Sequence, residues 1–411
     1  MGTLRQDADR IIREAIHDAL PDTAVKKALK EIRFNSGKTV LIAAGKAAWQ
    51  MARAAWDVAG DRIDGGVVIT KYEHSKGPVG NLGIFEAGHP VSDANSYMAT
   101  QRALDCVSGL TENDNVLFLL SGGGSALFEK PLTDEAECQS VTRQLLKSGA
   151  NIVEMNTIRK RLSAVKGGRF ALACAPAHVF SIVLSDIIGD PLDMIASGPA
   201  YPDSSTCAQA LEISRRYGLE LSDKAKALLA TETPKTLSNV TTYITGSVKQ
   251  LCESASRTAA ALGYEPRFLT AGLDCEARDA GTWLAKMARE NRDTGKSLAF
   301  IAGGETVVHL TGHGLGGRNQ EIALSAARGI SGLKDTCVFS VGSDGTDGPT
   351  DAAGGFCDQD TQENLRAQGI DIDSVLADND AYHALRKCGG LVVTGATGTN
   401  VNDLTVLLIK R

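Results

Sequence analysis

Short apolar runs alternate with longer amphipathic segments along almost the whole chain. We expect strands at residues 40–43, 67–69, 116–120, 179–184, 243–245, 266–269, 298–301, 307–310, 337–341, 391–393 and 404–409. Segments with apolar residues at helical spacing, such as 7–33, 47–59, 248–262 and 277–291, lie between them. Strands that are apolar on both faces and alternate with helices are typical of parallel sheets covered by helices on each side.

The chain has 411 residues, which is too long for one compact core. Its polar segment 231–239, which contains Pro234, is the best candidate for a linker. We therefore predict two α/β/α domains, at residues 1–235 and 236–411, with an active-site cleft between them.

Composition and charge exclude several classes of protein. The net charge of −6 disfavours a nucleic-acid binder, because neutralising phosphates needs a basic face. Nine cysteines without a C-x-x-C pair argue against a disulfide framework and a zinc ribbon. No apolar stretch is long enough to span a membrane and the first residues are polar, so we expect a cytoplasmic protein without membrane partners. Assembly into a homo-oligomer is compatible with the sequence.

Six of the predicted strands are followed by glycine-rich or polar loops. These loops are 44–46, 121–125, 185–190, 303–305, 342–348 and 394–400. In open α/β sheets, ligands bind beyond the carboxyl ends of the strands. One such loop is compatible with a purely structural turn, but six of them favour a shared ligand site.

Two of these loops carry clustered carboxylates. Asp344, Asp347 and Asp351 lie among glycines after the predicted strand 337–341, and Asp186 and Asp190 follow the strand 179–184. Carboxylates on a flexible loop suit a divalent cation or a polar substrate.

Candidate anion-binding groups lie in four places. Ser121, Gly122, Gly123, Gly124 and Ser125 offer successive backbone N–H groups to a phosphate. Lys46 follows a buried strand, and Lys160, Lys166 and Arg169 belong to a basic stretch that is otherwise typical of a solvated face. Residues 312–317 match G-x-G-x-x-G but lack the acidic residue that a dinucleotide site needs, and Arg318 follows them at a predicted helix start. His89 is most simply a structural histidine.

Eight motifs in order resemble the class II glycerate kinases, the glycerate 2-kinases whose C-terminal part is the MOFRL domain. They are IAAGKAAWQMA (42–52), GHPVSDAN (88–95), LLSGGGSALFEKP (119–131), NTIRKRLSAVKGGR (156–169), LSDIIGDPLDMIASGPAYPD (184–203), GGETVVHLTGHGLGGRNQE (303–321), GSDGTDGPTDAAG (342–354) and TGATGTNVNDL (394–404). The resemblance implies an N-terminal Rossmann-like domain and a smaller C-terminal α/β domain. It also implies transfer of the γ-phosphoryl group of Mg-ATP to D-glycerate, giving 2-phosphoglycerate.

The resemblance places Lys46 and Arg318 as the catalytic pair, and we add Asp186 to them. Loop 121–125 with Gly316, Gly317 and Asn319 is expected to bind ATP. Lys160, Lys166, Arg169 and Glu305 are expected to bind D-glycerate. Asp190, Asp344, Asp347 and Asp351 are expected to hold Mg²⁺, and the residue that accepts the substrate's proton is left open.

Two other functions compete with a kinase. An NAD(P)H-dependent hydroxypyruvate reductase would use the glycine stretch 312–317 as a dinucleotide loop. A non-catalytic sugar-acid sensor would need neither Lys46 nor Arg318.

Overall fold

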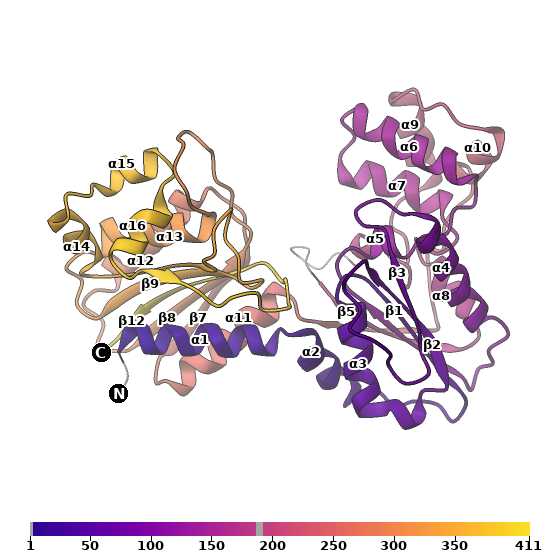
Figure 1. The fold of residues 1–411 in the computed structure, drawn as a ribbon, viewed down its shortest axis with the longest axis horizontal. Helices are drawn as coiled ribbons and strands as arrows, with labels where there is room; N and C mark the ends of the chain where they lie inside the picture. The colour runs from indigo at the N-terminus through magenta and orange to yellow at the C-terminus, as the bar shows by residue number, and fades with distance from the viewer. Residues whose placement is uncertain (1–2, 186–191) are drawn as a thin grey trace. The chain divides into compact units, whose positions relative to one another are not determined.

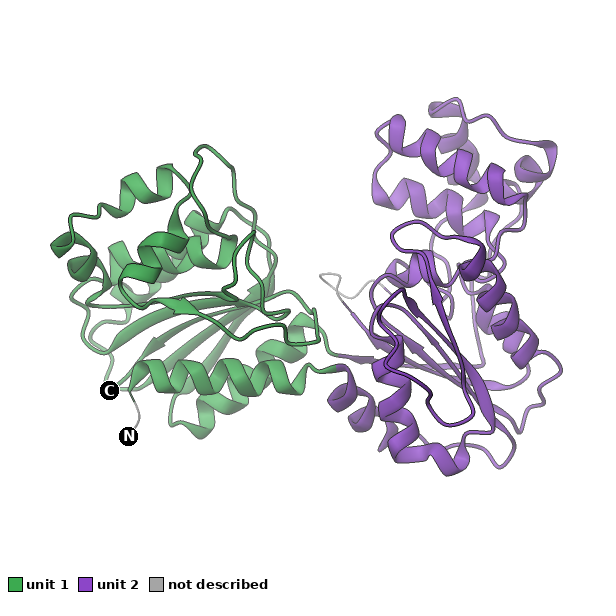
Figure 2. Ribbon diagram, in the orientation of Figure 1, with its two compact units in different colours: residues 1–20, 186–189, 246–411 green, residues 21–185, 190–245 purple. Residues whose placement is uncertain are grey.

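The computed structural model describes residues 3–185 and 192–411. The chain divides into two compact units, which Figure 2 colours separately. Unit 1 contains residues 1–20, 186–189 and 246–411, and unit 2 contains residues 21–185 and 190–245.

Unit 2 is built on a six-stranded sheet in which every pair of neighbouring strands is parallel. Its strands are β1 (Thr39–Ala44), β2 (Gly65–Lys71), β3 (Gly83–Ala87), β4 (Asn115–Leu120), β5 (His178–Leu184) and β6 (Val240–Thr245). The order β3-β2-β1-β4-β5-β6 is that of a dinucleotide-binding Rossmann sheet. The strand order reverses between β1 and β4, so a ligand crevice is expected beyond the carboxyl ends of these two strands.

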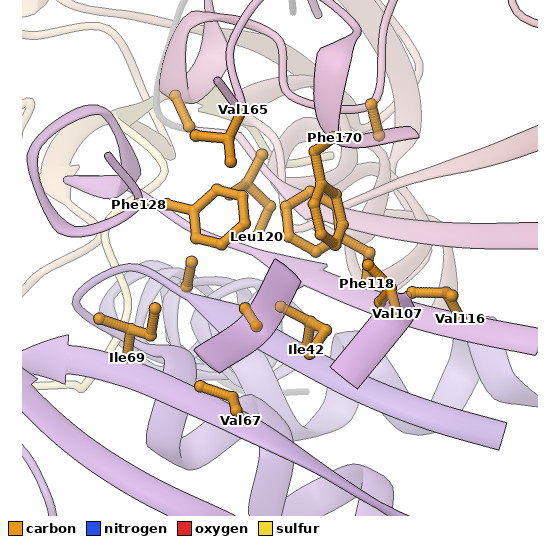
Figure 3. Close-up of a cluster of buried hydrophobic side chains, with 14 of the residues drawn as sticks. Ile42, Val67, Ile69, Val107, Val116, Phe118, Leu120, Phe128, Val165 and Phe170 are labelled. Carbon is orange, nitrogen blue, oxygen red and sulfur yellow. The ribbon is translucent and has the colours of Figure 1, made fainter. Parts of the chain in front are cut away.

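Helices cover both faces of this sheet (Figure 1). They are α2 (Pro21–Leu29), α3 (Ala48–Ala59), α4 (Ala94–Val107) and α8 (Arg169–Cys174), with the short α5 (Gly124–Leu127) after β4. The core beneath α4 and α8 contains three mutually packed rings, Phe118, Phe128 and Phe170, with centroids 4.8–5.6 Å apart (Figure 3). Their burial fixes the segment that follows β4 against the sheet.

A group of four helices forms a separate layer within unit 2. They are α6 (Glu135–Lys147), α7 (Ile152–Leu162), α9 (Cys207–Arg216) and α10 (Asp223–Leu229). They share their own apolar core around Leu145, Ile158 and Leu229. Helix α7 therefore has one face in this core and another free to carry polar residues.

The six-stranded sheet of unit 1 is mixed, because only β7 and β8 are parallel neighbours. Its strands are β7 (Glu265–Leu273), β8 (Leu298–Gly304), β9 (Thr336–Gly342), β10 (Gly354–Asp358), β11 (Leu391–Val392) and β12 (Asp403–Ile409). Strand β12 runs antiparallel between β8 and β9, so its first residue lies beside the carboxyl ends of both. The sequence pattern does not show whether β12 is parallel or antiparallel, since a buried central strand is apolar in either direction.

Helices also cover both faces of the unit 1 sheet (Figure 1). They are α1 (Leu4–Asp18), α11 (Val248–Ala261), α12 (Ala277–Glu290), α13 (Arg318–Ile330), α14 (Thr361–Ala367), α15 (Ile372–Ala377) and α16 (Ala381–Lys387). Helices α1 and α11 lie on one face and the other five on the opposite face. None of the helices within the described residues is long and apolar enough to cross a membrane.

The domain limits differ from those expected from the sequence, strands β3 and β10 were not expected, and one expected strand is not formed. Helix α1 belongs to unit 1, where the buried Asp7 accepts hydrogen bonds from Tyr264 Oη and Lys410 Nζ, both at 2.7 Å. Strand β6 pairs with β5 and moves the limit of unit 2 to residue 245. Residues 307–310 do not form the expected strand, because they make a single bridge at Val307 and expose Leu310.

Candidate functional site

The loops that follow β1 and β4 meet at the point where the strand order of the unit 2 sheet reverses. The N–H of Lys46 donates a 2.9 Å hydrogen bond to the carbonyl of Gly122. The next N–H, of Ala47, donates to Ser121 Oγ at 3.1 Å. The structure thus brings together Lys46 and loop 121–125, two of the groups singled out in the sequence.

Glycine at position 45 permits this close approach. Gly45 has a φ of +128°, which L side chains rarely adopt, and a Cβ there would lie 2.2 Å from Ser121 Oγ. Gly123 has a φ of +83°, and a Cβ on it would lie 3.1 Å from both His89 Nε2 and Lys46 Cγ. Lys46 and His89 therefore both lie against Gly123.

Several cationic or protonatable groups surround this point. Lys46 is exposed, and the carbonyl oxygen of Lys46 lies 3.1 Å from His74 Nδ1. Burial lowers the pKa of His89, and the nearby positive charges of Lys46, Lys71 and His74 lower it further. These groups come from the ends of three adjacent strands, β1, β2 and β3, and make the edge of the sheet favourable for an anion such as phosphate.

A chain of hydrogen bonds fixes the hydroxyl of Ser125. Ser197 Oγ donates to Asn156 Oδ1 at 2.9 Å, while Asn156 Nδ2 lies 3.8 Å from the sulfur of Met194. Because the single hydroxyl proton of Ser197 is used on Asn156, the 3.1 Å contact between the two serines has Ser125 as donor. The hydroxyl proton of Ser125 is then used within the protein, so a phosphate at this loop depends on its backbone N–H groups.

The backbone around Ser197 is held in an unusual conformation. Ala196, Ser197 and Gly198 have φ values of 49°, 61° and 63°. Residues held in the left-handed region cost free energy and gather at functional sites. Here the conformation is held by hydrogen bonds from the N–H groups of Gly167 and Gly168 to the carbonyls of Ser197 and Gly198, at 3.0 and 2.7 Å.

Arg159 is a site residue that the sequence analysis did not select. Its Nη2 donates to the carbonyl of Ser125 at 3.1 Å, which places a guanidinium beside loop 121–125. His89 was likewise interpreted as structural, although it lies against Gly123. Neither position is distinguishable by residue type alone, because a charge run and a lone histidine are ordinary surface and core features.

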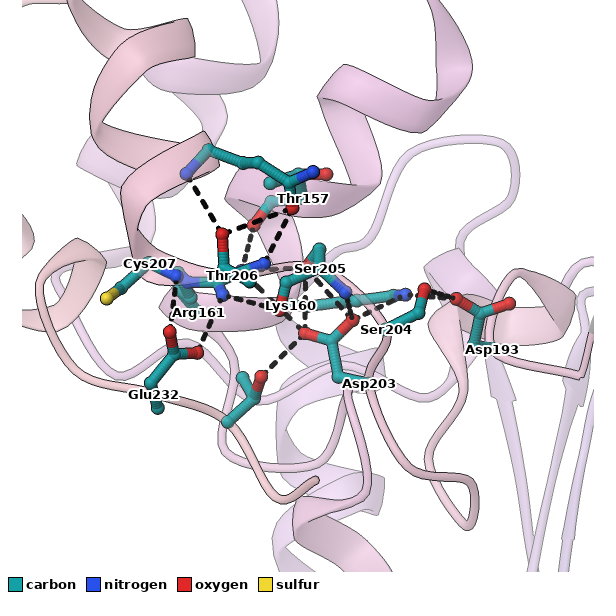
Figure 4. Close-up of polar contacts among 12 residues, drawn as sticks. Thr157, Lys160, Arg161, Asp193, Asp203, Ser204, Ser205, Thr206, Cys207 and Glu232 are labelled. Atoms are coloured by element: carbon teal, nitrogen blue, oxygen red, sulfur yellow. Dashed lines mark hydrogen bonds and ion pairs between the residues drawn. The ribbon is translucent and has the colours of Figure 1, made fainter. Parts of the chain in front are cut away.

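The three neighbouring cations expected to bind substrate have structural roles instead. Lys160 Nζ is buried between Asp203 Oδ1 at 3.0 Å and Asp193 Oδ2 at 3.3 Å (Figure 4). Lys166 Nζ is buried against Glu129 Oε2 at 2.6 Å. Arg169 Nη1 donates to the carbonyls of Arg161 and Ser163, at 3.1 and 2.7 Å. All three cations are satisfied by groups of the protein, so we reassign them to the architecture of unit 2.

Figure 4 shows why this basic stretch is buried rather than solvated. Arg161 is fully buried and donates to Ser205 Oγ at 2.9 Å and to Glu232 Oε2 at 3.3 Å. Burial acts to raise the pKa of Asp203, but the bond from Thr233 and the charge of Lys160 hold it below its usual value. The network attaches helix α7 to residues 203–207 and 232–235.

In unit 1, Arg318 lies at the first position of α13, beside the start of β12. Its Nε donates to Asp403 Oδ2 at 2.5 Å and its Nη2 to Asp403 Oδ1 at 3.1 Å. Its Nη1 lies 3.1 Å from Glu305 Oε1, and Glu305 is half exposed. The buried carboxylate of Asp403 thus orients the guanidinium, and Nη1 faces the accessible carboxylate of Glu305.

The side chains of Asp347 and Asn319 form hydrogen bonds within the protein at the start of α13. Asp347 is buried and accepts from the N–H groups of Asn319 and Gln320, at 3.1 and 2.9 Å. Burial raises the pKa of Asp347 to about 6, with a further contribution from the neighbouring charge of Asp403. Asn319 Oδ1 accepts from Ser340 Oγ, so the side chain expected to bind ATP is itself buried and paired.

The expected carboxylates do not form one cluster. Within the described residues, no group of three or more His, Cys, Asp and Glu side chains is placed to hold a metal ion. Asp351 accepts from Tyr382 Oη at 2.7 Å, and Asp186 and Asp190 lie outside the described residues. However, a Cβ on Gly342 would lie 3.3 Å from Asp344 Oδ1 and 3.6 Å from Asp403 Oδ1. Asp344 is therefore the described carboxylate that fits Mg²⁺, which is usually held by one or two carboxylates together with substrate phosphates, because both oxygens of Asp403 already accept from Arg318.

The glycine stretch 312–317 is shaped by packing. A Cβ on Gly312 would lie 2.3 Å from Asp378 Cα, and one on Gly314 would lie 2.4 Å from Asp380 Cβ. Gly317 is equally tight against Asp347. Residues 305–311 separate the stretch from β8 and form no strand, so the direct strand–turn–helix context of a dinucleotide loop is missing. The same packing explains Gly316 and Gly317 without a nucleotide.

Comparisons with known proteins agree with the resemblance seen in the motifs. Residues 7–230 match the family described as a domain of unknown function (DUF4147), and residues 298–403 match the MOFRL family. The D-glycerate 2-kinase of Thermotoga maritima is 51% identical over 99% of both chains. The glycerate 2-kinase of Pyrococcus horikoshii is 38% identical over 99% of this chain and 97% of its own. A putative hydroxypyruvate reductase of Agrobacterium vitis is 40% identical over 98% and 94%.

Solved structures give the same result for the fold. The crystal structure of the Thermotoga maritima glycerate kinase matches with a TM-score of 0.93, at 51% identity over 99% of both chains. A Pyrococcus horikoshii protein matches with a TM-score of 0.95, at 38% identity over 100% of this chain and 99% of its own. Both the two-domain α/β fold and the expected family are confirmed, and the chain belongs to the glycerate 2-kinase family that carries the MOFRL domain.

Proposed function

We propose that this protein transfers the γ-phosphoryl group of Mg-ATP to the 2-hydroxyl of D-glycerate, giving 2-phosphoglycerate and ADP. The observation that carries the proposal is the assembly of Lys46, His89 and loop 121–125 where the strand order reverses, a place suited to phosphate. The names of the relatives with 51% and 38% identity support the same reaction.

In this mechanism the substrate's 2-hydroxyl oxygen forms a bond to the γ-phosphorus, the bond from that phosphorus to the bridging oxygen of ADP breaks, and the proton of the 2-hydroxyl is released. Phosphoryl transfer depends mainly on positioning and on neutralising charge. Lys46 and Arg318 supply positive charge to the transferring group. Asp403 orients Arg318 through two hydrogen bonds.

Magnesium would neutralise further charge on the nucleotide phosphates when bound. Asp344, beside Gly342, is the described carboxylate that fits it. Asp186 and Asp190 stay predictions for the catalytic and metal sites. We also propose a cytoplasmic location, in keeping with nine free cysteines, and leave assembly into a homo-oligomer as a prediction.

Reduction of hydroxypyruvate is the weaker candidate. One relative is a putative hydroxypyruvate reductase, but the glycines that suggested this activity pack against residues 378–381 in this chain. The two activities are separated by measuring ADP release with D-glycerate and Mg-ATP, and NADH consumption with hydroxypyruvate. ADP release that requires both D-glycerate and Mg²⁺, without NADH consumption, supports the kinase. NADH consumption without ADP release would overturn it.

A further inference from the structure

A small pocket lies next to loop 121–125 within unit 2. Its volume is about 230 Å³, and its walls come from residues 90–92 and from helices α4, α6 and α7. Arg159 forms one wall and also donates to the carbonyl of Ser125. Residues 90–92 directly follow His89, which lies against Gly123. Arg159 and residues 90–92 therefore connect the pocket to the group formed by His89, Gly123 and Ser125.

Charge in the pocket favours an anion. Arg143 and Arg159 both line it. Glu129, the acidic residue that lines the pocket, adds no net charge, because it is paired with the buried Lys166 at 2.6 Å. Cys138 also lines the pocket, and burial, followed by the charge of Glu129, raises the pKa of its thiol to about 11, so it stays protonated. The two guanidinium groups are left to attract a negatively charged ligand.

Glu129 supplies a second, independent indication of a ligand. It is 3% exposed, lines the pocket, and uses Oε2 to pair with Lys166. Its Oε1 is buried and has no hydrogen-bond partner among the described residues. A buried acceptor without a partner is unfavourable, so it is suited to a hydroxyl donor that arrives with a ligand.

The size and the apolar rim limit what fits. The volume is below the roughly 300–1,000 Å³ of typical ligand pockets, so a whole nucleotide is excluded. Val91 and Leu146 line the pocket and are 67% and 62% exposed, so they are available to cover a short carbon chain.

We propose that this pocket binds the acceptor substrate, a short hydroxycarboxylate, through its carboxylate and its terminal hydroxyl. This assignment rests on the proposed function. Arg143 and Arg159 bind the carboxylate, and Glu129 Oε1 accepts from the 3-hydroxyl of D-glycerate. Holding both ends leaves the hydroxyl on the middle carbon as the nucleophile, which accounts for phosphorylation at the 2-position.

The test compares Arg143→Gln and Arg159→Gln with Lys147→Gln, an exposed control at the end of α6. Loss of one charged hydrogen bond corresponds to about a 10- to 100-fold rise in the KM for D-glycerate. We expect that rise for Arg143→Gln and Arg159→Gln, with the KM for ATP within about twofold of wild type in Arg143→Gln, and no change for Lys147→Gln. A rise in the KM for ATP instead, or no rise in either KM for Arg143→Gln, would overturn the assignment.

A binding measurement separates this assignment from the proposed function. Ligand-observed NMR of D-glycerate with the wild-type protein requires neither ATP nor turnover. Binding that weakens in Arg143→Gln supports the pocket even if no phosphoryl transfer is detected, in which case only the proposed reaction fails. Weaker binding of D-lactate, which lacks the 3-hydroxyl, supports the role of Glu129. Absence of D-glycerate binding, or equal binding of D-lactate, would contradict it.

Discussion

Arg318 and Asp403 form a two-point ion pair, with Nε 2.5 Å from Oδ2 and Nη2 3.1 Å from Oδ1. The two residues come from the start of α13 and the start of β12, which lie 85 positions apart in the sequence. Burial acts to lower the pKa of Arg318, but the bond to Asp403 and the charges around it raise that pKa above its usual value. The guanidinium is therefore a permanent, oriented positive charge.

Replacing Arg318 tests whether this charge serves catalysis. We expect Arg318→Ala to lower kcat by at least about 10²–10³, the usual cost of losing a group that stabilises transition-state charge. Arg328→Ala is the matched control, because Arg328 is on the same helix and pairs with the exposed Asp373. Steady-state kinetics with both substrates measures the effect, and near wild-type turnover in Arg318→Ala would remove it from the mechanism.

The family resemblance assigns Lys46 and Arg318 to one catalytic pair. Lys46→Ala alone should lower kcat by at least about 10². Groups that act as a unit are strongly non-additive, so the double variant should lose much less than the product of the two single losses. Single-turnover rates of the four proteins measure this coupling. Fully multiplicative losses would show that the two residues act independently.

Lys160 is expected to matter for stability and not for substrate binding. Lys160→Met leaves the buried Asp203 without its closest cation, and breaking a buried ion pair typically costs about 3–5 kcal/mol. Lys226→Met is the control, since Lys226 pairs with the exposed Asp223. Urea denaturation should show the loss only in Lys160→Met, with the KM for D-glycerate unchanged in the folded protein. A raised KM at unchanged stability would restore the substrate-binding role.

The raised pKa of Asp347 predicts how the stability of the protein depends on pH. Its pKa is about 6 in the folded protein and about 3.9 in an unfolded chain, so between these values the folded state binds the proton more tightly. Its contribution to stability is therefore least favourable above pH 6 and improves as the pH falls toward 4.

The comparison is with Asp347→Asn, which cannot titrate. The free energy of unfolding of wild type minus that of Asp347→Asn should rise from pH 7 to pH 4, by up to about 3 kcal/mol at about 1.4 kcal/mol per pKa unit. Urea denaturation at several pH values measures it. A difference that stays flat, or falls with falling pH, would show that folding does not raise the pKa of Asp347.

Much of the fold follows from the sequence pattern. The alternation of apolar runs and helices predicts two α/β units and ten of the twelve strands within them. The pattern does not predict that β12 is antiparallel, or that α1 covers the unit 1 sheet. The pattern of an amphipathic helix shows which of its faces is buried but not which sheet covers that face. In this structure Tyr264 and Lys410 attach α1 to unit 1 by hydrogen bonds to Asp7.

The candidate site was predictable in part. Glycines at strand ends and the cations beside them indicate Lys46 and loop 121–125, which the structure brings together, while the role of Arg318 stays a prediction. The basic stretch 156–169 misleads, because sequence does not show that Asp203 and Glu129 bury Lys160 and Lys166 while Arg159 turns toward Ser125. Asp403 lies in the motif 394–404, but an aspartate at the start of an apolar strand does not by itself indicate a site residue.

The most direct test of the proposed function is ³¹P NMR of the reaction of purified protein with D-glycerate and Mg-ATP. The account predicts ADP together with a phosphate monoester whose phosphorus couples to a single carbon-bound proton, as in 2-phosphoglycerate. A phosphorus coupled to two such protons, as in 3-phosphoglycerate, would contradict the assigned position of transfer. Unchanged ATP, with no new ester, would contradict the kinase itself.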